Sequence, residues 1–268
     1  MKVKAINMYQ IQIPFQEPFR ISSGEVTKSN SIIVRVTSEE GQIGYGEAAP
    51  MDGDFYSDIT PAHCWQILKE LCPGLIGKEF LGEDDFARLE ASSSFARAAI
   101  ETALWDCLAQ ERKQPLYNLI GGSKRRIDCG LAVGIFDSID ELLNSISRYL
   151  KGGYRRVKIK IKPGWDVEPI KAVRRSFGEI PLFVDANAAY TIDDVDVFRE
   201  LDNYNLMMYE QPFGVKALEE HAELARRVKT PVCLDEGVAD VSDAKRAVEL
   251  GSAKIINIKL QRVGGLGP

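Results

Sequence analysis

Hydrophobic and polar positions alternate near the start of the chain and later recur at helical spacing. Residues 3–13 alternate polar and apolar side chains and residues 31–37 are rich in β-branched ones, so both predict strands, with a third near 43–47. Apolar side chains at the spacing of one helix face mark three later stretches, 61–72, 83–91 and 94–111. The first half is therefore expected to form an α+β domain.

Residues 14–30, between the first two predicted strands, are rich in Pro, Gly, Ser and Thr. This composition predicts a loop, and the stretch is long for a simple hairpin connection. Because long ordered loops are often functional, 14–30 is a candidate binding segment.

The second half repeats one unit, an apolar strand followed by a helical pattern, about every 25 residues. The repeated strands are expected to begin near Arg156, Pro181, Leu206, Pro231 and Lys254, after an earlier strand at 128–134. The helices are expected at 138–151, 166–177, 191–202, 217–229 and 241–251. This alternation predicts parallel strands in a (β/α)8 barrel or a doubly wound sheet. No G-x-G-x-x-G sequence opens a helix after a strand, so the dinucleotide-binding signature is absent.

Six strands fit between residue 128 and the end of the sequence, whereas a closed barrel needs eight. We expect an α/β protein with a C-terminally truncated barrel, and an open six-stranded sheet is the alternative. The expected domains are an α+β domain at 1–125, which contains the loop 14–30, and a partial barrel at 126–268. Without closing strands the outer strands would be exposed edges, so the isolated chain is expected to aggregate.

Composition narrows the class of protein. There are 34 Lys and Arg against 39 Asp and Glu, a net charge of −5, so no basic nucleic-acid-binding face is expected. No apolar stretch is long enough for a membrane span, and the N-terminus lacks the apolar run of a signal peptide. The five cysteines are scattered without a C-x-x-C pair, which favours a cytoplasmic protein without a disulfide framework. His63 and His221 are too few for a multi-histidine metal centre and are expected to have packing or surface roles.

Acidic side chains end three successive predicted strands, at Asp185, Glu210 and Asp235. In a barrel these positions face one mouth, where active sites are built. Three carboxylates repel one another unless a cation lies among them, and a set of oxygen ligands suits Mg²⁺. A solvated acidic rim is the alternative interpretation.

Lysines occupy similar strand positions. Lys158 and Lys160 lie two residues apart on one strand, so both point to the same face, and Lys259 follows the last predicted strand. Two ammonium groups close together lower each other's pKa, which suits a base at neutral pH. Lys259 is expected to approach from the opposite side of the mouth. These groups predict abstraction of a proton next to a carboxylate, and an exposed edge with salt bridges is the alternative.

Five short motifs make the sequence similar to one known group of enzymes. They are Lys158-x-Lys160, Asp185-x-Asn187, Glu210-Gln211-Pro212, Asp235-Glu236 and Asn257-Ile258-Lys259. Together they resemble the muconate-lactonizing-enzyme subgroup of the enolase superfamily, and the segments 103–106 and 119–122 resemble its capping domain. Within that subgroup, 160–166 and 262–265 are similar to o-succinylbenzoate synthases and N-succinylamino acid racemases.

This resemblance implies a role for each matched residue. Asp185, Glu210 and Asp235 would bind Mg²⁺, or Mn²⁺ in its place, and the metal would stabilise an ene-diolate. Lys160 would be the base, with Lys158 assisting it. Lys259 would stabilise the ene-diolate or act as a second base. Polar side chains beside the ligands would be Asn187, Gln211 and Glu236, and a mobile loop over the substrate would include Phe19, Arg20 and Ser22.

The resemblance leaves three functions open. The first is an o-succinylbenzoate synthase, which dehydrates a cyclohexadiene acid in menaquinone biosynthesis. The second is an N-succinylamino acid racemase or a dipeptide epimerase, and the third is an inactive metal-binding fragment. Gly237, where Ser is common, and Leu260-Gln261, where Pro-Gly is common, depart from the synthase pattern. The expected partner is a small-molecule carboxylate, with no nucleic acid or membrane, and a homo-oligomer is left open.

Overall fold

The computed structural model describes residues 1–21, 24–51 and 59–268. The chain forms two compact units. The first comprises Met1–Gln16, Thr27–Arg125 and Lys259–Pro268, and the second comprises Glu17–Val26 and Arg126–Ile258. Two segments therefore depart from a simple division of the sequence at residue 125, namely 17–26 and the last ten residues.

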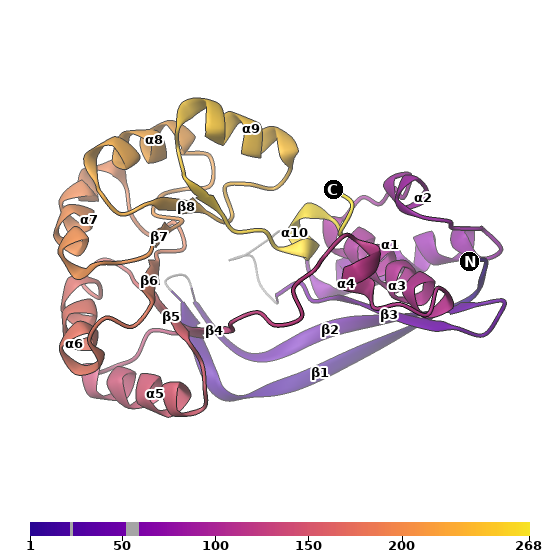
Figure 1. Cartoon of the computed structure of the whole chain (residues 1–268), viewed down its shortest axis with the longest axis horizontal. Helices are drawn as coiled ribbons and strands as arrows, with labels where there is room; N and C mark the ends of the chain where they lie inside the picture. Colours follow the sequence, from indigo (N-terminus) through magenta and orange to yellow (C-terminus); the bar gives the residue numbers. More distant parts are fainter. Residues whose placement is uncertain (22–23, 52–58) are drawn as a thin grey trace. The chain divides into compact units, whose positions relative to one another are not determined.

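The first unit combines a three-stranded sheet with helices of four to 18 residues (Figure 1). The sheet has the order β1-β2-β3, built from β1 (Val3–Ile21), β2 (Gly24–Ser38) and β3 (Ile43–Ala48). The helical segments are α1 (Pro61–Leu71), η1 (Cys72–Leu75), α2 (Glu83–Ala87), α3 (Ser94–Glu111), α4 (Leu116–Leu119) and α10 (Leu260–Val263). The predicted α+β character of this half is confirmed.

Helix α3 has the bounds that its apolar periodicity predicts. Ser93 caps its start, since the Ser93 hydroxyl accepts the Ala96 N–H. The helix packs directly on β3, where a Cβ on Gly44 or Gly46 would overlap the α3 backbone. Glycine at these two positions therefore allows the close approach that buries most of α3.

Residues 14–21 and 24–30, expected as a loop, instead continue strands β1 and β2. Their Pro, Gly, Ser and Thr content favours a loop locally, but strand pairing supplies hydrogen bonds that local composition does not report. Residues 17–21 and 24–26 of these strands belong to the second unit and are described below. Ser22 lies outside the described residues.

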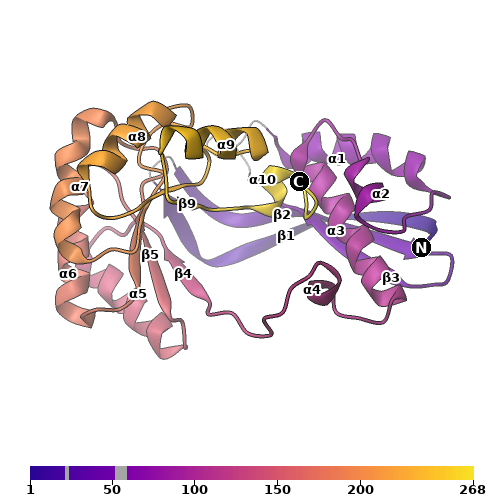
Figure 2. The same cartoon turned by 45° about the horizontal axis from the view of Figure 1, so that its top comes forward.

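The second unit is a six-stranded parallel sheet with the order β4-β5-β6-β7-β8-β9. Its strands are β4 (Gly130–Val133), β5 (Arg156–Lys160), β6 (Leu182–Asp185), β7 (Tyr209–Glu210), β8 (Val232–Leu234) and β9 (Ile255–Ile256). The alternating helices are α5 (Ile139–Lys151), α6 (Val167–Phe177), η2 (Ile192–Asp194), α7 (Val195–Leu201), η3 (Asp202–Tyr204), α8 (Leu218–Arg227) and α9 (Val241–Leu250). Figure 2 shows the helices together on one face of the strands.

The core of this unit lies between the sheet and its helices. On β5, Val157 and Ile159 are fully buried in the same apolar cluster as Ile170 and Val173 of α6. Because strand side chains alternate, Lys158 and Lys160 point to the opposite face. One strand thus supplies both packing for the fold and charge for a site. In the described part of the chain, no helix is long and apolar enough to cross a membrane.

Candidate active site

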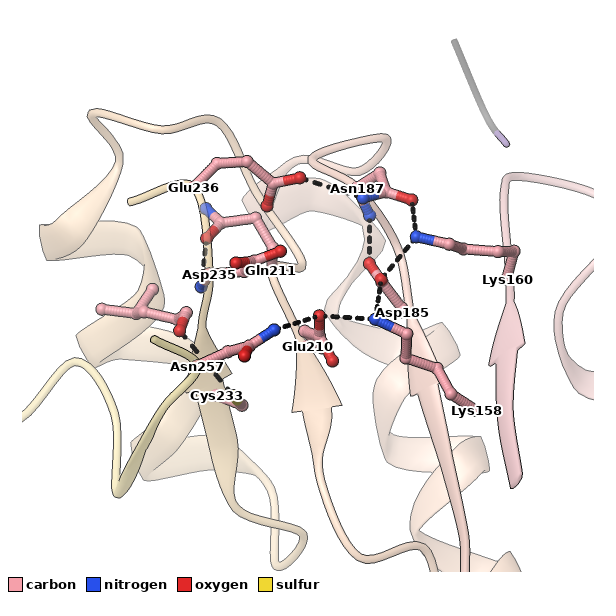
Figure 3. Close-up of polar contacts among 11 residues, drawn as sticks. Lys158, Lys160, Asp185, Asn187, Glu210, Gln211, Cys233, Asp235, Glu236 and Asn257 are labelled. Atoms are coloured by element: carbon pink, nitrogen blue, oxygen red, sulfur yellow. Dashed lines mark hydrogen bonds and ion pairs between the residues drawn. The ribbon is translucent and has the colours of Figure 1, made fainter. Parts of the chain in front are cut away.

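The carboxyl ends of the parallel strands bring three ionisable side chains side by side. Lys160 pairs in register with Asp185, and Asp185 pairs in register with Glu210. Register partners on adjacent strands point to the same face of a sheet. Side chains that are 25 residues apart in the sequence therefore lie close together at the carboxyl edge of the sheet, as Figure 3 shows.

Asp185 is the centre of an ion-pair cluster. Its Oδ2 lies 2.6 Å from Lys160 Nζ and 2.9 Å from Lys158 Nζ, and the residue is 1% exposed. Burial alone would raise the pKa of this carboxyl, but the two ammonium charges and their hydrogen bonds lower it to about 2. Asp185 is therefore held as an anion inside the protein.

Lys158 connects Asp185 to Glu210. Its Nζ also donates to Glu210 Oε1 at 2.8 Å. Burial lowers the pKa of Lys158, but the charges of Asp185 and Glu210 outweigh this effect and the pKa is raised. For Glu210, burial and the Asp185 charge raise the pKa, while Lys158 opposes them. Lys158 thus serves as a counter-ion to both carboxylates, and a lysine with a raised pKa is a poor base.

Lys160 is the lysine whose properties suit a base. It is buried, and its Nζ donates to Asp185 Oδ2 and to Asn187 Oδ1. Burial lowers its pKa from the ordinary 10.5, and the Lys158 charge adds to this, although Asp185 opposes both. A lysine with a lowered pKa holds its proton less tightly, as proton abstraction at neutral pH requires.

Polar side chains frame this cluster. Gln211 is fully buried, and its Oε1 accepts the N–H of Asp235 at 2.9 Å and of Gly237 at 3.0 Å. Asn187 donates its side-chain amide to Glu236 Oε1 at 3.0 Å. Asn187 and Gln211 have φ of 44° and 40°, a left-handed conformation that is costly for residues with a Cβ. The side-chain hydrogen bonds of Asn187 and Gln211 therefore accompany a left-handed backbone conformation just after β6 and β7.

Asn257, which sequence reasoning did not place among the site residues, also contacts Glu210. Its Nδ2 donates to Glu210 Oε1 at 3.0 Å. The signal was present, because Asn257 begins the motif that follows the last strand. An amide at this position leaves one oxygen of Glu210 with two donors, Asn257 and Lys158.

The donor chemistry fits a hard divalent cation. Asp185, Glu210 and Asp235 are 1%, 2% and 0% exposed, so all three carboxylates are buried. Two ammonium groups pair with the first two of them. Among the described residues, no three acidic, histidine or cysteine side chains converge closely enough to form a ready metal cluster. The Lys158 ammonium lies between Asp185 and Glu210 and neutralises both. The residues therefore suit Mg²⁺, provided that Lys158 makes room.

The predicted substrate segment lies at the ends of β4 and β5, within the second unit. Arg20 binds Asp137 at 2.8 Å and Glu25 at 2.7 Å, and its carbonyl accepts the N–H of Ile135. Phe19 and Arg20 line a cavity of about 600 Å³ with residues 132–137. This is a candidate binding volume, and the role of Phe19 and Arg20 in it remains a prediction.

Lys259 lies at the N-cap of α10 and belongs to the first unit. Along the chain it follows Asn257 by two residues. Its expected place opposite Lys160 therefore stays a prediction. The structure brings together Lys158, Lys160, Asp185, Asn187, Glu210, Gln211, Asp235, Glu236 and Asn257.

Two family models match this chain. Residues 5–121 match the mandelate racemase / muconate lactonizing enzyme N-terminal domain, and residues 141–268 match the enolase C-terminal domain-like family. The chain belongs to the enolase superfamily. The three-stranded sheet with its helices comes before the parallel six-stranded sheet, so the expected α/β fold with a TIM-barrel-like sheet is confirmed.

Individual relatives within the superfamily are similar along nearly the whole chain. An o-succinylbenzoate synthase of Geobacillus kaustophilus is 40% identical over 99% of this chain and 72% of the relative. An N-succinylamino acid racemase of an Amycolatopsis species is 37% identical, covering 99% and 73%. A dipeptide epimerase of Enterococcus faecalis, solved with Mg and the dipeptide L-Leu-L-Tyr, has a TM-score of 0.91 at 30% identity, covering 99% and 76%. The expectation of an enzyme of this superfamily, a lyase or an isomerase, is confirmed.

Proposed function

We propose that this protein removes a proton from the carbon next to a carboxylate, with o-succinylbenzoate synthesis by dehydration as its reaction. The observation that carries the proposal is Lys160, a buried lysine whose Nζ lies 2.6 Å from the buried Asp185 carboxylate and whose pKa is lowered. Relatives named o-succinylbenzoate synthase, at 38% and 40% identity, support the choice of reaction. The enzyme would act in menaquinone biosynthesis in the cytoplasm on a small-molecule carboxylate, without nucleic acid or membrane partners.

We assign separate roles in this reaction to the metal-binding acids and to Lys160. Asp185, Glu210 and Asp235 would hold Mg²⁺, which supplies positive charge to the substrate carboxylate and to the charge that develops when the proton leaves. Lys160 would accept the proton and return it to the departing hydroxyl. Asp185 and Asn187 orient the Lys160 ammonium, so that its Nζ is already placed before substrate binds.

Lys259 completes the proposed chemistry as a second cationic group. In a dehydration its charge would stabilise the ene-diolate. In a racemisation it would exchange a proton on the opposite face of the substrate carbon. The same lysines thus serve either reaction, which agrees with relatives named as synthases, racemases and epimerases.

A racemase or epimerase is the second candidate. The departure at Leu260-Gln261 favours it, because that position resembles epimerases more than synthases. The substrate would then be an N-succinylamino acid or a dipeptide in place of the cyclohexadiene acid.

The test offers both substrate classes to the protein with Mg²⁺, and follows dehydration by absorbance and racemisation by polarimetry. Lys160→Ala should abolish either activity, whereas Lys162→Ala, an exposed lysine two residues away, should not. Exchange of the substrate α-proton with solvent deuterium, measured by NMR, reports the proton transfer directly. Full exchange in Lys160→Ala would contradict the proposal. Binding of Mg²⁺ without activity on either substrate would favour the inactive metal-binding alternative.

A further inference from the structure

A buried glutamate on α3 holds the segment that follows Lys259. Glu101 lies in the middle of α3 and is 0% exposed. Its carboxylate accepts the backbone N–H of Gly267 at 2.9 Å and the N–H of Leu266. Helix α10 also packs on α3 within the first unit (Figure 2). Two backbone donors from one segment therefore meet one buried anion.

Burying the Glu101 carboxylate costs free energy that its partners must offset. A buried carboxylate loses its hydration and must be paired or hydrogen-bonded, and hydrogen bonds to an anion are the strong ones. Arg97, one turn earlier on α3, lies 3.9 Å from Glu101 and donates to the carbonyl of Gly264. The pair thus holds the segment 264–267 through both its N–H and its C=O groups.

The shape of the segment matches the carboxylate. Gly265 has φ of 136°, and a Cβ there would overlap the Glu101 carboxylate. Gly264, with φ of 95°, ends α10 by donating its N–H to Leu260 O at 2.9 Å. Leu266 packs on the apolar core of the first unit. Glycine at 265 lets the backbone come close enough for Glu101 to bind it.

The other end of α10 begins at Lys259. The Lys259 carbonyl accepts the N–H groups of Arg262 at 3.0 Å and Val263 at 3.1 Å, so the lysine backbone is part of the α10 turn. The side chain of Gln261, inside that turn, accepts the N–H of Ala49 at 2.8 Å. The turn is thus fixed to the first unit both at Gln261 and, through the glycines, at Glu101.

We propose that Glu101 is a positioning residue that fixes α10 and thereby the backbone from which Lys259 projects. The importance of this for catalysis rests on the function proposed above for Lys259. The anchoring itself is a separate claim and is measured without activity.

The test measures hydrogen–deuterium exchange of residues 260–268 in the protein with both units present. In the unmodified protein the amides of Leu266 and Gly267 should exchange slowly, and rapid exchange there would overturn the proposal. Glu101→Gln should speed exchange of this segment about ten- to hundredfold, because one acceptor oxygen is replaced by an NH₂ group and the remaining hydrogen bond is no longer charge-assisted. Glu101→Asp, which keeps the charge, should restore part of the protection. Gln110→Ala, at an exposed position of the same helix, should change nothing.

A second readout separates positioning from general stability. Lysine side chains are labelled with ¹³C-methyl groups, and the NMR resonance that is missing in Lys259→Arg is assigned to Lys259. This resonance should shift in Glu101→Gln but not in Gln110→Ala. An unchanged resonance, or faster exchange spread evenly over the first unit, would show a merely structural role and overturn the proposal. If Glu101→Gln does not fold, Gly265→Ala displaces the same segment from the other side and should give the same two changes. Full turnover in Lys259→Ala would refute the catalytic role proposed for Lys259 while leaving the anchoring result intact.

Discussion

The side-chain oxygen of Gln211 accepts the backbone N–H of Asp235 at 2.9 Å, which joins the end of β7 to the end of β8. The same oxygen accepts the N–H of Gly237, and the Gln211 amide donates to the carbonyl of Phe213 at 2.9 Å. One buried side chain therefore satisfies three backbone groups and sets the position of Asp235, a predicted metal ligand.

Gln211→Leu should destabilise the protein, because it removes the acceptor of two buried N–H groups. Each buried donor left unpaired costs about 1–3 kcal/mol. We expect a lower midpoint of urea unfolding, together with weaker binding of Mg²⁺ by calorimetry because Asp235 is displaced. Gln114→Leu, at an exposed position of the first unit, is the control. A Gln211→Leu protein with unchanged stability would show that these bonds contribute nothing net.

Asp235→Asn should weaken Mg²⁺ binding by at least about tenfold, since even groups that only orient a ligand affect affinity by that much. Asp235 is fully buried just after β8, and its charge acts on the neighbouring Glu210. Isothermal titration with Mg²⁺ measures the change. Asp196→Asn, an exposed carboxylate on α7, should leave the affinity unaltered. Equal affinities in the two variants would remove Asp235 from the metal site.

Lys158→Met should destabilise the metal-free protein and increase its response to Mg²⁺. The variant loses the ammonium that lies between Asp185 and Glu210, and removing one partner of a buried ion pair costs about 3–5 kcal/mol. A divalent cation can replace the lost charge, so Mg²⁺ should raise the Tm more in this variant than in the parent. Lys162→Met, an exposed lysine nearby, is the control. The same Mg²⁺-induced rise in Tm in both variants would contradict this account.

Much of the fold follows from local periodicity. Helix α3 matches the predicted range because its apolar spacing and its serine cap are local signals. The three strand-end acids could be predicted because the strand–helix unit repeats at constant length. The strand extensions through residues 14–21 and 24–30 could not, because pairing between distant residues overrides a loop-like composition.

The details of the site depend on contacts that spacing does not encode. The sequence places Lys158 and Lys160 on one face, but their different pKa shifts arise from which carboxylates each one contacts. Lys158 meets two carboxylates, whereas Lys160 meets Asp185 and the neutral Asn187. Likewise the role of Glu101 could not be predicted from the sequence, because residues 266 and 267 contact it only in the folded chain.

His221, expected to have a packing role, should make stability depend on pH. Its Nε2 accepts the N–H of Phe213 at 3.2 Å, and its Nδ1 donates to the carbonyl of Ala217 at 2.6 Å, which requires the neutral ring. Burial lowers its pKa below the ordinary 6.5, with smaller opposing effects of the Ala217 hydrogen bond and the Glu220 charge. Since the unfolded chain takes up a proton first as pH falls, this contribution to stability is fully present above about pH 6.5 and is lost below it. Urea unfolding at pH 7.5 and 5.5 should therefore show a pH-dependent loss in the parent and in the His63→Gln control, and a smaller loss in His221→Phe. An equal loss in all three proteins would show that His221 is not its source.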